Sequence, residues 1–510
     1  MTAPLKDRPM AAPTEPPTFR LFIAGEWVDS ESGRTFESHN PANTRDIIGR
    51  FQAGSAADVA RAVRAADTAG GLWRRTPAPK RGEILYRFAN LLMEEKDEFT
   101  DLMSHEMGKV KAEAGGDVQE AIDMSLYMAG EGRRLFGQTT PSELRDKFNM
   151  SVRMPIGVVG VITPWNFPIA IPSWKIAPAL ISGNTVVFKP ATDTPLLGER
   201  FVELLIEAGL PGGVINIVHG GGGAVGDRLV RHPDVPVITL TGSRETGVEV
   251  MRNAAENLKH VHLELGGKNA IIVLDDADLD LAVEGIVWSA FGTSGQRCTA
   301  ASRVIVQTSV YNRLESKLVD AAERLTLGPG WEDSTDVGPV INEAALEKIH
   351  SYTRIGEEEG AKLLTGGERV TSDGLDKGFF YRPTIFGRVD PQMRVAQEEI
   401  FGPTTALIRV RDVDEAIRVS NGIEFGLSSS IFTRDVNTAF RAMRDLEAGI
   451  TYINAGTIGA EVHLPFGGTK HTGNGHREAG QAALDVFTEW KSIYVDYSGK
   501  LQKAQIDTDS

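Results

Sequence analysis

The sequence predicts an α/β fold in which a domain with a parallel sheet is followed by a second α/β domain. From residue 158 onward, short runs rich in Val, Ile and Thr alternate with helical segments, and a second series of such runs follows Cys298. Continuous apolar strands separated by helices are typical of parallel sheets covered on both faces. The expected strands are "GVVGVIT", "NTVVFKP", "INIVHG", "VPVITLTG" and "NAIIVLDD", then "SRVIVQ", "AKLLTGG", "YRPTIFG", "ALIRV", "SSSIFT" and "GITYIN".

The N-terminal region is expected to hold a tail and then helices. Residues 1–17 are rich in proline and charge and lack the apolar core of a signal peptide, which predicts a flexible tail. From about residue 55, apolar residues recur at helical spacing with charges between them. The uncharged run from Met154 to Trp174 has bilayer-spanning length, but its prolines at 155, 164, 168 and 172 argue against a membrane helix. We expect a buried strand over 158–163 and then an irregular loop.

The bulk composition excludes some functions. The net charge of −15 argues against a general nucleic-acid or anionic-membrane surface. The single cysteine among 510 residues excludes an internal disulfide and fits a reducing, cytoplasmic setting. That cysteine, Cys298, stands in "FGTSGQRCTAASRV" behind glycine and small residues. It is either a small apolar core residue or a nucleophile.

Three segments are candidates for binding a cofactor. "HGGGGAVGDRL" matches a dinucleotide fingerprint in letters, but four consecutive glycines satisfy many patterns. Gly242 and Ser243 open a predicted helix, where free N–H groups suit a phosphate; an ordinary serine N-cap is the alternative. Lys189 ends a strand, where open sheets bind ligands, although a surface lysine is the simpler interpretation.

Seven separated motifs together resemble the aldehyde dehydrogenase superfamily, of the NAD(P)⁺-dependent, hydrolytic type. They follow the family's order over essentially the whole chain: "PWNFP", "FKPATDTP", "LTGSRETG", "LELGGKN", "GQRCT", "EEIFGP" and "PFGGTKHTGNGHRE". The resemblance implies a Rossmann-like cofactor domain from residues 18–136 and 156–266, and a catalytic domain from 267–455. It also implies a small β oligomerisation element from 137–155 and 480–500, in a homodimer or homotetramer.

The same resemblance implies roles for four catalytic residues. Cys298 would attack the aldehyde as a thiolate, and the Asn166 amide and the Cys298 N–H would hold the oxyanion. Hydride would pass to the nicotinamide and leave a thioester, which water activated by Glu264 would hydrolyse. Relatives that pass the acyl group to coenzyme A generally lack an acid at the Glu264 position, so its presence favours hydrolysis. Lys175 would support the reacting site.

The resemblance also implies a cofactor site for NAD⁺ or NADP⁺. Glu399 and Phe401 match positions that hold and flank the nicotinamide-side ribose. Many NAD-preferring relatives have a glutamate where this chain has Thr192, and a neutral residue there admits the 2′-phosphate of NADP⁺. Asp193 opposes that phosphate and Arg244 favours it, so we predict use of both cofactors. The expected cofactor residues are Ile162, Thr163, Pro164, Trp165, Lys189, Thr192, Gly222, Gly242, Ser243, Leu265, Gly266, Glu399 and Phe401.

Substrate clues leave two interpretations open. Phe167, Trp174 and Phe466, with Trp165, are suited to line a tunnel for ordinary aldehydes. Arg297, beside the cysteine, would clamp a substrate carboxylate with two nitrogens and lower the pKa of the thiol. The alternative is that Arg297 faces only structure or a neighbouring subunit. Arg297 and Glu120 in "GGDVQEAIDM" are similar to the aminoadipate-semialdehyde branch of the family. The first interpretation is a broad aldehyde substrate, and the alternative is a semialdehyde of the aminoadipate, glutamate or ketoglutarate type.

Other readings of the chain make different predictions. "DDADLD" (275–280) imitates a calcium loop but has Leu281 where that loop needs glycine, so we expect an acidic helix start and no metal site. We likewise expect no nucleic-acid or membrane partner.

A non-catalytic member of the fold would have lost Cys298 or Glu264. A cofactor-free cysteine hydrolase would use the same thiol and acid, and NAD(P)⁺ reduction separates it from a dehydrogenase.

Overall fold

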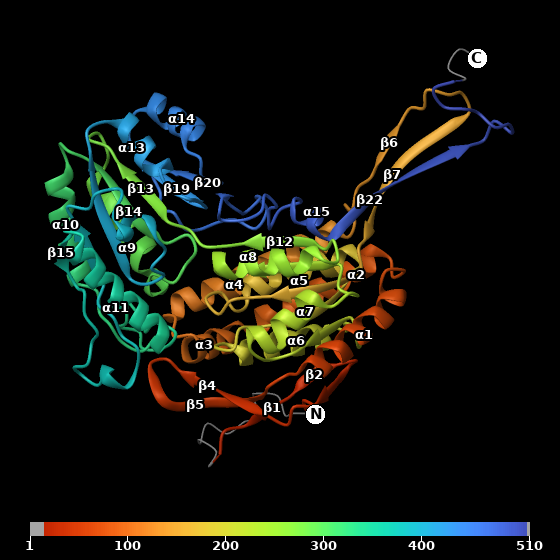
Figure 1. Ribbon diagram of the computed structural model, residues 1–510, viewed down its shortest axis with the longest axis horizontal. Coiled ribbons are helices and arrows are strands. Elements are labelled where there is room, and N and C mark those ends of the chain that lie inside the picture. Colours follow the sequence, from red (N-terminus) through yellow and green to blue (C-terminus); the bar gives the residue numbers. More distant parts are fainter. Residues whose placement is uncertain (1–14, 507–510) are drawn as a thin grey trace.

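The computed structural model describes residues 15–506, and its strands form two large sheets (Figure 1). The first has seven strands in the order β12 (His260–Glu264), β11 (Val237–Thr241), β8 (Val158–Ile162), β9 (Thr185–Lys189), β10 (Ile215–Ile217), β2 (Leu21–Ile23) and β3 (Glu26–Val28). The second has seven in the order β15 (Lys362–Thr365), β16 (Thr384–Gly387), β17 (Thr404–Val410), β14 (Ala301–Gln307), β13 (Asn269–Val273), β19 (Ser428–Phe432) and β20 (Ile450–Ile453). Both are mainly parallel, with antiparallel pairs at the β2–β3 and β15 edges.

Helices cover both faces of the first sheet, because its strands are apolar on both sides. In β8, Val159 and Val161 join the core formed with α2 to α6, whereas Val158 and Ile162 join the core formed with α1, α7 and α8. The helices are α1 (Ala56–Trp73), α2 (Ala78–Glu94), α3 (Lys96–Glu106), α4 (Lys111–Glu131), α5 (Ala170–Ser182), α6 (Pro195–Glu207), the π-helix η2 (Gly222–Gly226), α7 (Asp227–Arg231) and α8 (Arg244–Ala255).

The second sheet is covered in the same way, by α9 and α10 on one face and by α12 to α14 on the other. Asp278 caps α9 by accepting the Asp280 and Leu281 N–H groups, so "DDADLD" is a helix start. The helices of this part and beyond are α9 (Leu279–Phe291), the 3-10 helix η3 (Gly292–Gly295), α10 (Tyr311–Glu323), α11 (Glu343–Glu358), the 3-10 helix η4 (Leu375–Lys377), α12 (Arg394–Gln397), α13 (Val413–Asn421), α14 (Val436–Asp445) and α15 (Ala483–Phe487).

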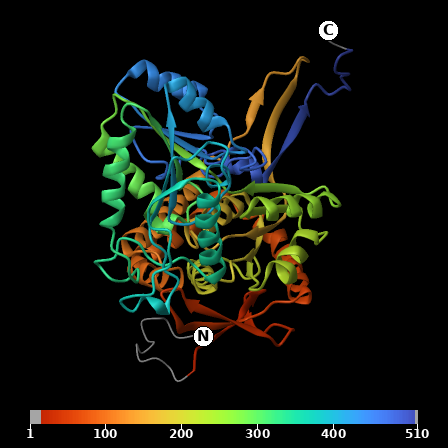
Figure 2. The ribbon, with the colours of Figure 1, turned by 60° about the vertical axis from the view of Figure 1, so that its left-hand side comes forward.

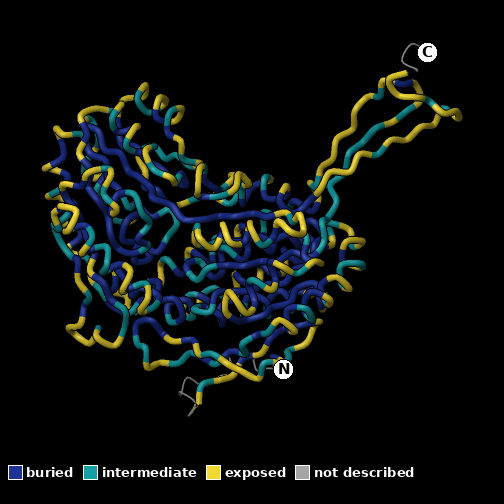
Figure 3. The backbone as a smooth tube through the Cα atoms, viewed as in Figure 1, coloured by how far each residue is buried: buried dark blue, intermediate teal, exposed yellow. Residues whose placement is uncertain are grey.

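Three small sheets complete the fold. A three-stranded sheet of β22 (Thr488–Asp496), β7 (Lys147–Pro155) and β6 (Gln138–Thr140) extends away from the body and is mostly exposed (Figures 1, 2 and 3). The other two are β1 (Thr18–Phe19), β5 (Asn43–Gln52) and β4 (Thr35–Asn40), and the pair β18 (Phe425–Gly426) and β21 (Thr469–Lys470). Of the tail predicted over 1–17, residues 1–14 lie outside the described residues. None of the helices in residues 15–506 is long and apolar enough to cross a membrane.

Candidate active site

The strands of the first sheet end at one edge, where open parallel sheets bind their ligands. Lys189 ends β9, Thr241 ends β11 and Glu264 ends β12. Thr241 and Glu264 are direct partners in the parallel register. The backbone of Glu264 is therefore fixed by its pairing with β11, and this restricts the positions that the Glu264 carboxylate can reach.

Cys298 follows a left-handed turn that the small residues before it make possible. Thr293 and Gly295 have φ angles of 53° and 67°. A Cβ atom on Gly295 would stand 2.0 Å from the Gly402 carbonyl oxygen, so only glycine fits there. The Glu113 carboxylate holds the turn, because its two oxygens accept the Thr293 N–H at 2.9 and 2.8 Å. A β-branched residue in this conformation needs such support.

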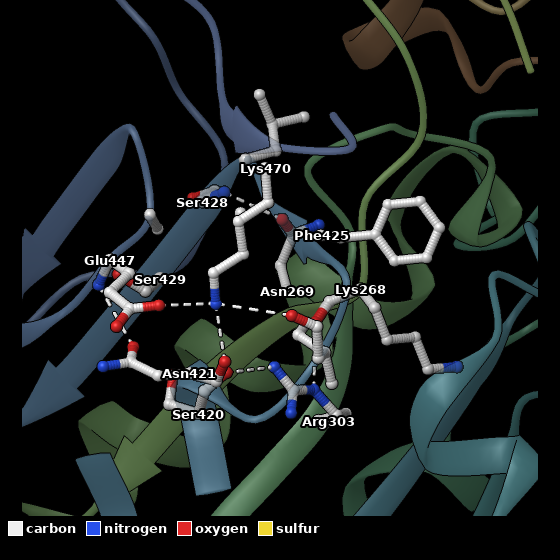
Figure 4. Close-up of a pocket in the computed structure, with 14 residues that line it drawn as sticks. Lys268, Asn269, Arg303, Ser420, Asn421, Phe425, Ser428, Ser429, Glu447 and Lys470 are labelled. Atoms are coloured by element: carbon white, nitrogen blue, oxygen red, sulfur yellow. Dashed lines mark hydrogen bonds and ion pairs between the residues drawn. The ribbon is translucent and has the colours of Figure 1, made fainter. Parts of the chain in front are cut away.

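Asn269 holds the chain on the other side of Cys298. Its amide nitrogen donates to the Cys298 and Ala300 carbonyl oxygens at 2.7 and 3.0 Å. Figure 4 shows the cluster behind it, where Arg303 donates to the Lys268 carbonyl oxygen at 2.9 Å. The pocket among these residues has a volume of only about 10 Å³, room for roughly one water molecule. The cluster is thus a support for the Cys298 segment.

Cys298 lies between two cavities and lines both of them. One has a volume of about 410 Å³ and the other of about 240 Å³. Thr241 and Leu265, at the ends of β11 and β12, line both cavities as well. A thiol in this position can meet a substrate from one side while a second molecule is bound on the other.

The larger cavity brings together the residues expected to bind substrate. Besides Cys298 and Glu264, it is lined by Glu120, Phe167, Trp174, Arg297 and Phe466. Trp174 and Phe466 pack edge to face with ring centroids 4.9 Å apart. These rings form an apolar wall, whereas Glu120 and Arg297 place ionisable groups in the same cavity.

The smaller cavity brings together most of the residues expected to bind the cofactor. They are Pro164, Trp165, Gly242, Ser243, Leu265, Gly266, Glu399 and Phe401, joined by Asn166. The Glu399 carboxylate accepts the Gly267 N–H at 2.9 Å, and a Cβ on Gly266 would overlap its oxygens at 2.4 Å. A carboxylate at this point accepts hydrogen bonds from ribose hydroxyls, and Ser243 caps α8, whose first-turn N–H groups suit a phosphate.

The remaining predicted residues line neither of these two cavities. Thr192 lines a third cavity of about 340 Å³ with Arg34, Gly220 and Gly221. Of the others, Ile162 ends β8 and is followed by Thr163, Lys189 ends β9, Gly222 begins η2, and Lys175 lies within α5. Lys189 is buried, and burial lowers the pKa of its amine to about 8.

The electrostatics of the site act against a charged thiol. Burial, followed by the Glu264 and Glu399 carboxylates, raises the pKa of Cys298 to about 12. The expectation that Arg297 lowers this pKa is wrong, because the guanidinium is bound to Glu113 at 3.0 Å and the nearby carboxylates dominate. Burial also raises the pKa of Glu264 well above its usual range, with Glu478 adding to the effect.

Comparison with known proteins decides what kind of site this is. A sequence profile described as the Aldehyde dehydrogenase family matches residues 27–493. The chain belongs to the aldehyde dehydrogenase family. It is an oxidoreductase that oxidises aldehydes with NAD⁺ or NADP⁺.

Individual relatives cover nearly the whole chain of this aldehyde dehydrogenase. It is 43% identical over 486 residues to "Alpha-ketoglutaric semialdehyde dehydrogenase" of Bacillus subtilis (strain 168), which covers 95% of this chain and 100% of the relative. It is 43% identical over 478 residues to "Alpha-ketoglutarate semialdehyde dehydrogenase" of Haloferax volcanii. This match covers 93% of this chain and 98% of the relative. A betaine aldehyde dehydrogenase structure from Staphylococcus aureus in complex with NAD⁺ matches with a TM-score of 0.92 and 36% identity. The match covers 94% of this chain and 96% of that structure's chain.

Several residues of this aldehyde dehydrogenase site escaped the sequence analysis. Glu478, Glu113 and Thr241 line the larger cavity, and Lys348 from α11 lines the smaller one. Glu478 and Thr241 carried a signal, since Glu478 closes the motif "PFGGTKHTGNGHRE" and Thr241 lies in "LTGSRETG". The others lie in unremarkable helical sequence, and the tertiary fold alone brings them to the site.

Lys175 supports the aldehyde dehydrogenase site from behind the sheet edge. Its ammonium group is fully buried, pairs with the Glu478 carboxylate and donates to Thr239 Oγ1 at 3.1 Å. His262 lies in the same cluster, with Nδ1 3.5 Å from Glu478 Oε1. A chain of ionisable groups thus leads away from Glu264.

Proposed function

We propose that this aldehyde dehydrogenase oxidises a carboxylate-bearing semialdehyde, with α-ketoglutaric semialdehyde as the first candidate. The observation that carries the proposal is that the Arg297 guanidinium lines the substrate cavity directly beside Cys298. A guanidinium binds carboxylates in a fixed geometry. The names of the two relatives at 43% identity point to the same class of substrate.

Arg297 is already held, and this defines how it would bind a substrate. It donates from Nε to Thr293 Oγ1 at 2.9 Å and from Nη2 to Glu113 Oε1 at 3.0 Å, and it lies over the Phe167 ring at 5.5 Å. Nη1 makes no hydrogen bond among the described residues. We infer a substrate contact from this free edge, in place of the two-nitrogen clamp expected from the sequence.

Glu120 would assist such a contact. Burial and the nearby Asp117 raise the pKa of its carboxyl to about 8, so most of it is protonated at pH 7. A protonated carboxyl group donates a hydrogen bond, which suits a keto or carboxylate oxygen. If the substrate instead carries an amino group, Glu120 would ionise against the ammonium. An amino-acid semialdehyde is therefore the second candidate.

The catalytic residues would act on the aldehyde in two stages. Cys298 adds to the aldehyde carbon after its proton is removed, and Asn166 is placed to hold the oxyanion with its second amide hydrogen, since the first bonds the Gln296 carbonyl oxygen at 3.0 Å. A carboxylate with a raised pKa is a stronger base, which suits Glu264 for taking protons first from the thiol and then from the water that hydrolyses the thioester.

The residues of the smaller cavity fit a nicotinamide dinucleotide, which accepts the hydride when bound. Glu399 would hold a ribose and Lys348 would meet the negative phosphates. Trp165 and Phe401, packed edge to face at 5.6 Å, would shield the nicotinamide side from water.

We infer that both NAD⁺ and NADP⁺ are accepted. Arg34 lines the same cavity as Thr192 and adds a positive charge there. Asp193 is turned toward Asn342, whose amide donates to it at 2.8 Å, which reduces its repulsion of a 2′-phosphate. The ratio of kcat/KM for the two cofactors is expected to stay below roughly a thousand.

A glutamate at position 192 tests the cofactor inference. Thr192→Glu should lower kcat/KM for NADP⁺ about tenfold or more through charge repulsion and change that for NAD⁺ little. Thr192→Gln, of similar size but neutral, is the control. A loss that is equal for both cofactors would place Thr192 outside the 2′-phosphate site.

We also propose the domain roles implied by the sequence. Residues 18–136 and 156–266 would bind the cofactor, 267–455 would complete the catalytic site, and 137–155 with 480–500 would assemble the subunits. The projecting sheet of β6, β7 and β22 supports this assignment, since it leaves aromatic residues exposed. A homodimer or homotetramer would cover them.

Initial rates of NAD(P)H formation at 340 nm test the substrate. The panel is α-ketoglutaric, glutaric, succinic and aminoadipic semialdehydes, with hexanal as the aldehyde without a carboxylate. The wild-type protein should turn over α-ketoglutaric semialdehyde with the highest kcat/KM. A clear preference for hexanal would refute the proposal.

Substitution of Arg297 locates the carboxylate contact. Arg297→Leu should raise the KM for α-ketoglutaric semialdehyde at least tenfold and leave kcat/KM for hexanal within about threefold. Arg297→Lys, which keeps the charge, should have a KM for α-ketoglutaric semialdehyde between those of the wild type and Arg297→Leu. Equal losses with both aldehydes would show that Arg297 only holds the Thr293 turn.

A further inference from the structure

Three polar atoms buried near the end of β12 have no hydrogen-bond partner among the described residues. They are both carboxylate oxygens of Glu264 and Nε2 of His262. Glu264 Oε1 and His262 Nε2 are 3.7 Å apart, so a small rotation of either side chain would bring them into hydrogen-bonding distance. A buried polar group without a partner destabilises the folded protein, and proteins often keep such a group for a catalytic role.

The strand geometry places His262 between two carboxylates. His262 and Glu264 are two residues apart on β12, so their side chains lie on the same face. Thr239, the partner of His262 on β11, has its hydroxyl 3.0 Å from Nδ1, and Glu478 Oε1 is 3.5 Å from the same nitrogen. One ring nitrogen faces the base of the hydrolytic step, and the other faces a hydroxyl and a second carboxylate.

The neighbours favour the tautomer with the proton on Nδ1. Lys175 donates to both Thr239 Oγ1 and Glu478 Oε1, and beside Nδ1 the Glu478 carboxylate only accepts, whereas the Thr239 hydroxyl can accept or donate. Nε2 then presents its lone pair to Glu264. Burial lowers the pKa of His262, which favours a neutral imidazole, and burial raises the pKa of Glu264, which makes its carboxylate a stronger base.

The charged groups around His262 come from three elements. On its own strand is Glu264, and α5 contributes Lys175. The segment before α15 contributes Glu478, Arg477 and the exposed His476, whose ring centroid lies 5.9 Å from that of His262. The two carboxylates favour a protonated imidazole, whereas Lys175 and Arg477 oppose it. His262 can therefore take up a proton only briefly.

We propose that His262 is a positioning residue for hydrolysis, which carries the proton of Glu264 to Glu478. The proposal rests on the hydrolytic step of the proposed function. Glu264 takes a proton from water as the water oxygen bonds to the thioester carbon. The carbon–sulfur bond breaks with its electron pair on Cys298, and the carboxylic acid product gives its proton to that thiolate. The Glu264 O–H bond then breaks, the proton joins His262 Nε2, and the Nδ1 proton passes to the Glu478 carboxylate. Glu264 is thereby returned to its basic form.

Stopped-flow measurement at 340 nm separates this step from aldehyde oxidation. In His262→Gln, the first turnover should still give NAD(P)H in an amount close to that of the subunits, because acyl formation does not use the relay. The following steady-state rate should fall at least tenfold with little change in KM. It should also rise with pH more steeply than in the wild type, as hydroxide replaces the relayed base.

Matched variants decide between a relay and a packing role. His260→Gln, on the same strand but exposed beside Glu489, should behave like the wild type. His262→Asn keeps a polar group near Thr239 but removes the atom facing Glu264, so it should share the defect of His262→Gln. Steady-state rates and pH profiles within twofold of the wild type in both variants would overturn the proposal. Loss of the first turnover together with the steady state would also overturn it, by showing a structural role.

The wild-type protein provides a readout if both variants fail to fold. Two protons moving in one step should give a curved plot of kcat against the deuterium fraction of the solvent, and a straight line would contradict the relay. Failure of the proposed function is distinct from all these results. In that case the wild type prefers hexanal to the semialdehydes, and the variants are compared with hexanal as the substrate.

Discussion

The surroundings of Cys298 hold it as a thiol. Burial and the carboxylates of Glu264 and Glu399 raise its pKa to about 12, and the Arg297 beside it is bound to Glu113. The thiolate is the nucleophilic form, so the enzyme needs a base that acts when the aldehyde is in place. Glu264 lines the same cavity and has the raised pKa that such a base requires.

The rate of alkylation reports this state directly, because the chain has a single cysteine. A raised pKa lowers the thiolate fraction at any pH below it. At pH 8 the ligand-free enzyme should react with iodoacetamide roughly a hundredfold or more slowly than free cysteine, whose pKa is about 8.5. The rate should increase about tenfold for each pH unit up to pH 10. Intact mass spectrometry measures it, and reaction at pH 7 as fast as that of free cysteine would contradict the prediction.

At the scale of elements, the turn η3 converts the end of α9 into the loop that presents Cys298. Its left-handed residues are held by Glu113 from α4, and its last residue, Gly295, lies against the backbone of the segment that follows Phe401. The turn thereby lies between Glu113, which lines the substrate cavity, and the segment of Phe401, which lines the cofactor cavity. A change in its backbone should affect chemistry and stability together.

Gly295→Ala tests the turn. The new Cβ would stand 2.0 Å from a backbone carbonyl oxygen at a φ of +67°, so the turn must open. We expect a clearly lower Tm and a kcat at least a hundredfold lower. Gly71→Ala is the control, because a Cβ there meets nothing within 4 Å in helix α1. It should leave activity unchanged and Tm equal or slightly higher. Full activity in Gly295→Ala would show that the turn is adaptable.

The helices and strands could be predicted from the sequence because they depend on apolar patterns and capping residues within a short stretch of chain. The run "GVVGVIT" is apolar on both sides since β8 is covered on both faces, and the strand spans Val158–Ile162 as expected, one residue short at its end. Asp278 and Ser243 could be recognised as helix starts from the residues around them. The antiparallel edges β2–β3 and β15 were not foreseen, since strand direction depends on the path of the chain.

The partners within the site could not be predicted, because they depend on contacts between distant segments. Glu113 reaches Thr293 across 180 residues, and Lys175 meets Glu478 across 303 residues. The sequence predicts that Arg297 lies near the nucleophile. Its pairing with Glu113 follows only from the way α4 packs beside the turn.

At the scale of the whole molecule, the projecting sheet is the feature that the subunit alone does not explain. β22 is an edge strand of nine residues that pairs along its full length with β7 and extends away from the body (Figures 1 and 2). Long exposed edges promote association with other chains, and exposed aromatic groups favour burial at an interface. We therefore expect this sheet to lie between subunits.

Charges placed on the projecting sheet should separate the subunits. Tyr494 and Tyr497 are 67% and 65% exposed, so neither is needed for packing within one subunit. In an interface, Tyr494→Glu combined with Tyr497→Glu would bury two carboxylates, which is unfavourable without partners. Light scattering coupled to size exclusion should show two or four subunits for the wild type and a smaller species for the variant. Leu72→Glu, at an equally exposed position of 67% on α1, is the control and should keep the wild-type mass. An unchanged mass in the double variant would place the interface on another surface.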